Sequence, residues 1–246
     1  MRRYTVYHRR STRRRGAPSG DYDEPMTSTP AARSAESAEA RREQILAAAR
    51  AVIEEHGPAA LTGQIADRAG LARPNVYRHF ASKEQLDLAV ARSAYRELRA
   101  AIRARIDLSG TPIEVIRAPV AAQVMWADEH PNLYRFLISR GHQQAARQRG
   151  DRGAFAAELA AAGARFLPRF GEDRAAAEAV LVGIIGLVDA SVVHWLDRRH
   201  CSRTDLIDTL TTQAWLVIDH RLRAMGEHLD PHAPLTQAPR SGISTP

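Results

Sequence analysis

Two short helical segments joined by a turn at Gly70 constrain the fold of this chain more than any other feature. The first covers about residues 63–69, with Thr62 as its expected N-cap, and Gly70 closes it. The second covers about residues 74–80 and begins at Pro74, whose missing N–H needs no partner in the first turn of a helix. A longer helix is expected on each side, so the two short segments are clamped between longer ones.

The remaining pattern is helical along most of the chain. Apolar residues at the spacing of one buried helix face predict a helix over about 41–56; they are Ile45, Ala49, Val52 and Ile53. Ser82 and Gln85 have the capping-box spacing, and a helix to about residue 106 follows them. Further helices are expected from Thr111 with a kink at Pro119, within 130–139 and 151–170, and over about 173–198 and 203–225. No segment alternates as a strand does, so the predicted fold class is all-α.

Composition and charge narrow the class of protein. The 246 residues are 44% apolar, which is ordinary for a folded globular chain, and the net charge of +7 favours polyanions such as nucleic acid or an anionic membrane surface. The longest apolar run, 179–188, is stopped by Asp189 at about half of the ~20 residues that a membrane span needs. The single cysteine, Cys201, excludes an internal disulfide and fits a reducing cytosol. We therefore expect a cytoplasmic protein without a membrane span.

The chain divides into four parts by composition. Residues 1–40 lack apolar periodicity and hold seven arginines in their first sixteen positions, which predicts a disordered basic arm. This arm either reaches a neighbouring minor groove or is an unstructured leader, and Met26 is an alternative start. Residues 41–86 form the expected DNA-binding domain, 87–225 a ligand-binding and dimerisation domain, and 226–246 a disordered tail.

Two short helices clamped in this way have the layout of a helix-turn-helix. Val76 and Phe80 share one face of the second helix and are expected to meet Ile45, Ile65 and Leu71 in a small core. The opposite face carries Pro74, Asn75, Arg78 and His79. Amide, guanidinium and imidazole groups beside a phenol suit phosphate oxygens and base edges, so this face favours DNA over a metabolite.

The stretch "ILAAARAVIEEHGPAALTGQIADRAGLARPNVYRHFASKEQL", residues 45–86, resembles the DNA-binding segment of the tetracycline-repressor (TetR) family of bacterial transcription regulators. One departure is that "LTGQIA" is one residue shorter than the usual run. The resemblance implies that the major groove is reached by Arg73, Pro74, Asn75 and Arg78. It implies that phosphates are held by Tyr77, His79 and Lys83, with further backbone contacts from Thr62 and Gln64.

A homodimer is expected, because one short recognition helix buries little DNA and operator binding normally needs two copies on a palindrome. The last two helices are the candidates for the interface, in line with the family's four-helix arrangement. Their stripes are Val180, Ile184, Leu187, Val188, Ser191 and Trp195 on one helix, and Leu206, Leu210, Gln213, Val217 and Arg221 on the other. The alternative is that these stripes pack inside the monomer.

The resemblance also implies a mostly apolar ligand cavity among the middle helices. The lining candidates are Met125, Trp126, Phe155, Phe166, His194 and Trp195. The alternative is that these side chains are ordinary core. A ligand that favours the wrong spacing of the two recognition helices would lower operator affinity, with the long helix after Ser82 as the lever.

Catalysis, metal binding and cofactors are not expected. His194 and His200 lie six residues apart, and no His, Cys or carboxylate cluster has the spacing of a zinc site. No nucleophile elbow, Walker motif or dinucleotide fingerprint occurs. The sequence predicts a DNA-binding transcriptional regulator, a repressor released from a palindromic operator by an apolar small molecule. The alternative is a dimeric small-molecule-binding protein or adaptor without operator binding.

Overall fold

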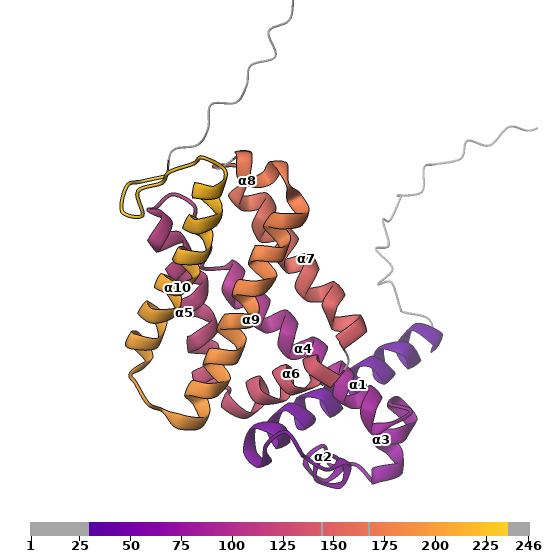
Figure 1. The fold of residues 1–246 in the computed structure, drawn as a ribbon. Helices are drawn as coiled ribbons and strands as arrows, with labels where there is room; N and C mark the ends of the chain where they lie inside the picture. The colour runs from indigo at the N-terminus through magenta and orange to yellow at the C-terminus, as the bar shows by residue number, and fades with distance from the viewer. Residues whose placement is uncertain (1–29, 144, 167, 236–246) are drawn as a thin grey trace, which may run out of the picture. The chain divides into compact units, whose positions relative to one another are not determined.

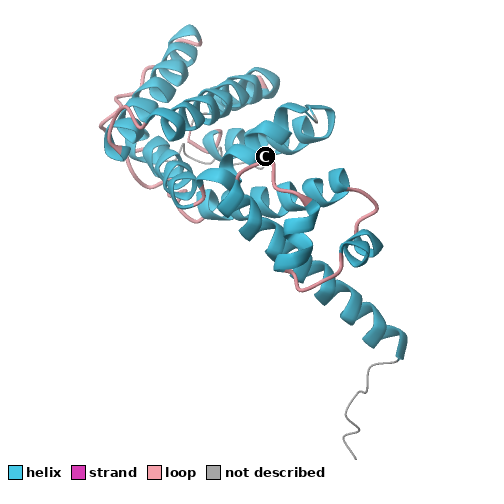
Figure 2. Cartoon of the chain, turned by 90° about the horizontal axis from the view of Figure 1, so that it is seen from below, coloured by secondary structure: helices cyan, strands magenta, loops and turns pink. Residues whose placement is uncertain are grey.

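The computed structural model describes residues 30–143, 145–166 and 168–235, and within these ranges every regular element is a helix (Figures 1 and 2). The described residues from 38 to 235 belong to one compact unit, which holds the contacts below. The all-α prediction is confirmed. The helices are α1 Pro30–His56, α2 Thr62–Arg68, α3 Arg73–His79, α4 Lys83–Arg103, α5 Pro112–Glu129, α6 Pro131–Gln143, α7 Ala145–Gly163, α8 Pro168–Glu172, α9 Arg174–Arg198 and α10 Arg203–Ala224.

The helix-turn-helix is formed by α2 and α3. Gly70 has φ +64°, a conformation in which a side chain would be strained, and this allows the sharp turn after α2. The start of α2 differs from the prediction, because Leu61 and not Thr62 is the N-cap residue. Gln64 accepts a hydrogen bond from the Leu61 N–H at 2.8 Å, and this contact closes the helix end that Thr62 was expected to cap.

The small core below α3 is as predicted. Val76 and Phe80 are both almost fully buried, together with Ile45 and Ile65, and Leu71 packs against them. Side chains of α1 also close the ends of the short helices. Arg42 donates to the His79 carbonyl at 3.0 Å and lies over the Phe80 ring, and Gln44 donates to the Ala69 carbonyl at 2.8 Å. The carbonyls at the end of a helix lack partners within it, so these bonds fix α2 and α3 on α1.

The helix α1 begins earlier than predicted. Disorder was expected through residue 40, whereas α1 starts at Pro30, so this part of the prediction was wrong. The side chains of residues 33–40 are exposed. These residues are rich in alanine and glutamate, which have high helix propensity, so they form a helix without apolar periodicity. The predicted disorder of residues 1–29 lies outside the described residues.

The segment after α10 also corrects the prediction of a disordered tail from residue 226. Gly226, with φ +77°, ends the helix, and residues 227–235 return to the start of α5. There Leu235 donates to the Gly110 carbonyl at 3.1 Å, and the Ile113 N–H donates to the Pro231 carbonyl at 3.3 Å. Residues 236–246 lie outside the described residues.

The remaining helices follow the sequence pattern, except that α7 starts earlier than predicted and α8 is a separate helix. Ser82 caps α4 by accepting a hydrogen bond from the Gln85 N–H at 3.2 Å, and α5 continues through Pro119. The region expected to form one helix over 151–170 holds α7, which starts at Ala145, and the separate short helix α8. The last two helices match their predicted bounds within two residues and lie side by side (Figure 1).

The apolar helix α9 is long enough, at 25 residues, to cross a membrane by length and composition. This differs from the length argument made on residues 179–188, because the helix continues apolar beyond Asp189. Asp189 is buried against Gln123 of α5, and α9 packs on both α7 and α10. The helix therefore serves as a core element within the compact unit, with one face left exposed.

Truncation of the Phe80 ring is expected to destabilise the DNA-binding segment. Phe80→Ala removes a fully buried aromatic side chain from the contact between α1 and α3, which typically costs about 3–5 kcal/mol of unfolding free energy. Urea denaturation followed by circular dichroism measures the loss. The control is Leu61→Ala, at a leucine that is 66% exposed, which is expected to change the value by less than ~0.5 kcal/mol.

Candidate DNA interface and ligand cavity

One face of α3 projects from the molecule above a buried anchor. Arg73, Pro74, Asn75 and Arg78 are exposed, and the side chain between them, Val76, is buried. The structure therefore brings together the four residues expected to reach the major groove. The face offers two guanidinium groups and one amide, which are groups that make bidentate contacts with guanine and adenine edges.

The phenol of Tyr77 stands beside this face and is held by two neighbours. The ring is 38% exposed, and hydrogen bonding to Thr62 and then to Arg73 lowers the pKa of the hydroxyl. Thr62 itself is only 5% exposed. Thr62 therefore contacts the Tyr77 hydroxyl from beneath the surface, a contact that the sequence did not predict, and its expected contact with the DNA backbone stays a prediction.

Lys83 lies at the first position of α4 and is half-buried. Its ammonium donates to Asp87 at 2.5 Å, and the other oxygen of Asp87 accepts from Arg140 of α6 at 2.5 Å. Asp87 is almost fully buried, and a buried carboxylate requires such cations. The lysine expected to hold a phosphate is therefore also part of a link between α4 and α6.

Two further residues were predicted to contact the DNA backbone. His79 is partly buried, and the Gln64 side-chain oxygen accepts a hydrogen bond from the Leu61 N–H.

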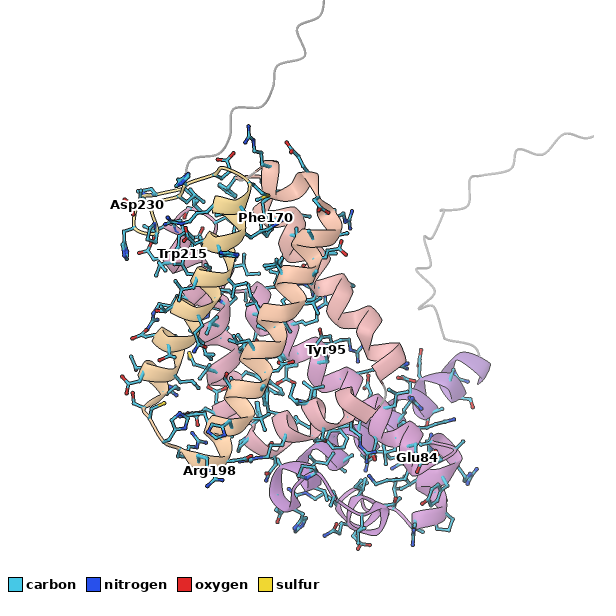
Figure 3. The ribbon with its side chains drawn as sticks, viewed as in Figure 1. Glu84, Tyr95, Phe170, Arg198, Trp215 and Asp230 are labelled. Atoms are coloured by element: carbon cyan, nitrogen blue, oxygen red, sulfur yellow. The ribbon has the colours of Figure 1, made fainter. Side chains whose placement is uncertain are left out.

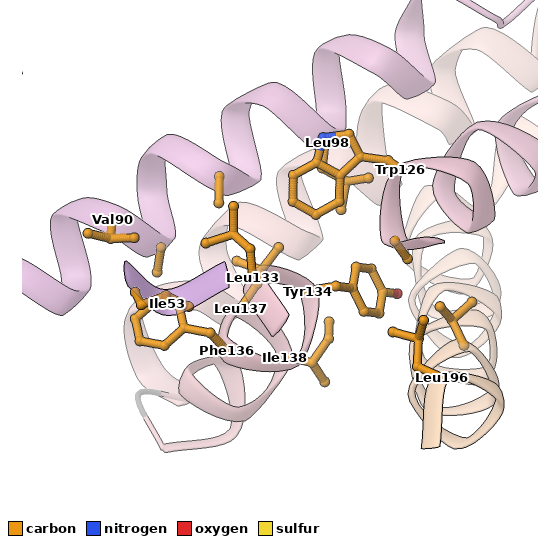
Figure 4. Close-up of a cluster of buried hydrophobic side chains, with 14 of the residues drawn as sticks. Ile53, Val90, Leu98, Trp126, Leu133, Tyr134, Phe136, Leu137, Ile138 and Leu196 are labelled. Carbon is orange, nitrogen blue, oxygen red and sulfur yellow. The ribbon is translucent and has the colours of Figure 1, made fainter. Parts of the chain in front are cut away.

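The helix α6 contacts both the DNA-binding segment and the cavity-forming helices. Glu54 of α1 accepts hydrogen bonds from the N–H groups of Asn132 and Leu133 at 3.2 and 3.0 Å, which caps the start of α6. In Figure 4 the side chains of Phe136 and Tyr134 point to opposite sides of α6, with Phe136 toward Ile53. The Tyr134 hydroxyl donates to Asp189 of α9 at 3.1 Å.

A cavity of about 200 Å³ lies among α4, α5, α7, α8, α9 and α10. Its wall is apolar apart from the Gln123 amide and the Trp215 indole N–H among the lining side chains. Figure 3 shows two lining residues, Phe170 and Trp215, at the far end of the helical domain from Glu84, which follows Lys83 at the start of α4. Leu229 and Leu235 of the C-terminal segment close part of the wall.

Two of the six predicted lining residues, Phe155 and Phe166, line this cavity. Met125, Trp126, His194 and Trp195 do not line it. The Trp126 indole donates to Glu97 at 3.1 Å and the Trp195 indole donates to the Cys201 carbonyl at 2.9 Å, so both rings are fixed elsewhere. His194 is exposed beside His200. Sequence reasoning missed Trp215, Phe170 and Leu235, and the single signal for Trp215 was that it stands off the main apolar stripe of α10.

The predicted dimer stripes need a similar correction. Val188, Trp195, Leu206 and Leu210 are buried within the monomer, so no partner chain can reach them, as the alternative interpretation anticipated. Of the other predicted residues, Gln213 and Val217 are exposed, whereas four on α9 and one on α10 are half-buried: Val180, Ile184, Leu187, Ser191 and Arg221.

A different face of the two helices is open. On α9 it consists of Ala179, Val182, Gly183, Gly186 and Ala190; on α10 it consists of Thr209, Thr212, Gln213, Leu216 and Val217. Leu216 is 58% exposed, and a Cβ added at either glycine would meet no neighbouring atom within 4 Å. We call this set the outer face. Small residues on it allow close approach of another helix, and its apolar members lack cover within the described chain.

Residues 45–90 match the family described as "Bacterial regulatory proteins, tetR family". This match spans the α1–α3 core, the exposed face of α3 and the start of α4. Residues 45–90 of the chain are therefore similar to the DNA-binding segment of the TetR family. A relative, the HTH-type transcriptional activator FasR of Mycolicibacterium smegmatis, is 33% identical over 103 residues, which are 42% of this chain. The match spans 47%, about half, of the length of FasR.

Solved TetR-family structures share the fold. A TetR-family regulator from Streptomyces coelicolor has a TM-score of 0.62 at 21% identity, covering 76% of this chain and 83% of its own. The fatty acid degradation regulator FadR from Bacillus halodurans has a TM-score of 0.57 at 19% identity, covering 71% of this chain and 94% of its own. At such low identity the likeness concerns the fold alone. Within the described residues of the present chain, no three metal-ligating side chains gather.

Removal of the Thr62 hydroxyl is expected to raise the pKa of Tyr77. The hydrogen bond from Thr62 is the largest cause that lowers this pKa, so Thr62→Val moves it back toward the ordinary value of 10.0. NMR titration of ring-labelled tyrosine measures the shift. The control is Thr212→Val, at an exposed threonine of α10 that bonds the Asp208 carbonyl, and there an unchanged Tyr77 titration is expected. An unchanged titration in Thr62→Val contradicts the assigned contact.

Proposed function

We propose that this chain is a sequence-specific DNA-binding transcriptional regulator of the TetR family that acts in the cytoplasm as a homodimer. The observation that carries the proposal is the exposed Arg73, Asn75 and Arg78 face of α3, held on buried Val76 and Phe80 within the family-matching segment. Base-edge contacts from this face would read sequence, and phosphate contacts from Tyr77 and Lys83 would set affinity and salt dependence.

An apolar small molecule in the cavity is the proposed effector, and its binding would release the regulator from a palindromic operator. The apolar lining around the single Gln123 amide supports this ligand class. Repression is the proposed direction, by occupation of the operator. FasR is named an activator, so a reporter gene placed behind the bound DNA tests the direction in this protein. Higher reporter expression with the regulator than without it contradicts repression.

Two helices support a mechanism that couples the cavity to the DNA. The long helix α4 contributes Ile102 to the cavity wall near its end and begins beside α3. The helix α6 joins Asp189 through Tyr134 and reaches Asp87 of α4 through Arg140. A ligand that prefers one arrangement of these helices would shift the spacing of the two recognition helices in the dimer and change operator affinity.

The outer face of α9 and α10 is the proposed dimer interface. Exposed apolar residues beside glycines and small residues match what a helix–helix contact between copies requires. This assignment replaces the buried stripes and retains Gln213 and Val217 from the sequence prediction. In a two-fold arrangement the same face of each chain meets the other.

We expect Asn75 to contribute to the recognition of one base pair and not to the general binding of phosphates. Asn75→Ala is expected to relax preference at one base pair of the operator, costing about 1–3 kcal/mol of discrimination there. Genomic fragments bound by the full chain supply the operator, and selection from random DNA then measures preference for each variant. A selection in which Asn75→Ala keeps the wild-type preference would refute this role.

The matched comparison is Tyr77→Phe, which removes a hydroxyl beside the same face. We expect it to weaken binding to operator and unrelated DNA by one common factor of about five, as for the loss of one hydrogen bond. Absence of DNA binding by the wild-type chain at low salt would favour the adaptor alternative over the whole proposal.

A charge on the outer face is expected to separate the dimer. Leu216→Arg places two like charges near each other across a two-fold contact and removes exposed apolar surface from it. Light scattering at micromolar concentration measures the molecular mass. Leu61→Arg changes a leucine of similar exposure on the DNA-binding segment, and it is expected to leave the dimer intact. A Leu216→Arg chain that remains dimeric places the interface elsewhere.

A further inference from the structure

A small second chamber adjoins the ligand cavity. It has a volume of about 30 Å³ and shares the lining residues Ile102, Gln123, Phe155 and Ile185 with the large cavity. The remaining wall adds three residues with polar groups, namely Tyr95, Arg99 and Asp189. The combined space is therefore apolar over most of its extent and polar at one end.

Arg99 provides an unused hydrogen-bond donor at the polar end. Its guanidinium lies between the rings of Tyr95 and Phe155, at 5.6 and 4.8 Å from their centroids, and its Nη2 donates to Glu158 at 3.0 Å. Its Nε is buried and has no hydrogen-bond partner. A buried N–H without a partner is unfavourable, so an acceptor atom brought into the chamber would be stabilised.

The size of the chamber limits this acceptor. A space of about 30 Å³ holds one or two groups of the size of a water molecule, such as a carbonyl oxygen. The bulk of a ligand would then lie in the cavity of about 200 Å³ between Phe166 and Trp215. The geometry separates one small polar group from a larger apolar body.

The charges around the chamber favour a neutral acceptor. The Asp189 carboxylate is buried in its wall and accepts hydrogen bonds from Gln123 at 2.8 Å and Tyr134 at 3.1 Å. Arg99 and Arg103 share the Glu158 carboxylate, so these two cations are balanced by Glu158 and Asp189 together. A ligand carboxylate would add a second negative charge close to Asp189 at low dielectric, which is unfavourable.

We propose that the effector is a predominantly apolar molecule with one uncharged carbonyl group near its end, as in a ketone, an ester or a lactone. The carbonyl oxygen accepts a hydrogen bond from Arg99 Nε in the small chamber, and the apolar body occupies the large cavity. This inference rests on the proposed function, because it names the ligand class of the same cavity.

Three probes of similar size test the ligand class on the full chain. Displacement of the neutral dye N-phenyl-1-naphthylamine by 2-octanone, heptanoate and octane gives their relative affinities. We expect 2-octanone to bind about ten- to a hundredfold more tightly than either other probe, as for one hydrogen bond to a charged donor. Equal affinities, or tightest binding of heptanoate, would overturn the inference while leaving cavity binding intact.

A lysine at position 99 tests the donor. Arg99→Lys keeps the positive charge beside Glu158 and removes the Nε–H, so 2-octanone affinity is expected to fall to that of octane, with octane affinity unchanged. The matched control is Arg103→Lys, because Arg103 holds the same Glu158 through bonds of 2.7 and 2.6 Å and lines neither chamber. This control is expected to keep the preference for the ketone.

The outcomes separate this inference from the proposed function. A ketone preference that survives in Arg99→Lys rejects the role of Nε. Failure of all three probes to displace the dye contradicts the ligand-binding part of the proposed function as well as the inference. DNA binding is measured independently of the probes, so its loss or presence bears on the regulator assignment alone.

Discussion

The nearly complete burial of one carboxylate, that of Asp87, governs how the DNA-binding segment is joined to the helical domain. A buried charge is tolerated when it is paired, and its two oxygens are served by Lys83 on one side and Arg140 on the other. Removal of one partner from such a pair typically costs about 3–5 kcal/mol. The start of α4, directly after the recognition helix, is thus tied to α6, and α6 is tied in turn to α1 through Glu54.

Helix existence and helix ends were largely predictable from the sequence because they depend on local chemistry. Ser82 and Thr111 cap α4 and α5 through their own side chains, and Gly70 supplies the positive φ at the turn. The anchor of α3 was predictable for a similar reason, since Val76 and Phe80 are one helical turn apart. The early start of α1 was missed because exposed alanine-rich helix has no apolar periodicity to reveal it.

Which helix faces pack against each other, and which residues line the cavity, was harder to predict from the sequence. The apolar residues of α9 surround most of the helix, so the pattern alone cannot state which side meets α7 and α10 and which side is left open. The prediction consequently placed Val188 and Trp195 in the interface and left out Val182, although the first two are buried and Val182 is exposed. The cavity was harder still to predict, since its wall combines residues from six helices and a returning C-terminal segment. An aromatic residue such as Trp126 fills the core equally well.

The C-terminal segment of residues 227–235 bears on how quickly an effector leaves the cavity. Leu229 and Leu235 close part of the cavity wall, and backbone hydrogen bonds near Gly110 and Ile113 are among the contacts that hold the segment. A segment with few bonds opens at a lower free energy than the helices behind it. The residence time of an effector would then depend on local unfolding of residues 227–235, and the affinity of the cavity for the same effector would depend on its apolar wall. Changes in this segment can therefore alter how long a regulatory signal lasts without altering which molecule evokes it.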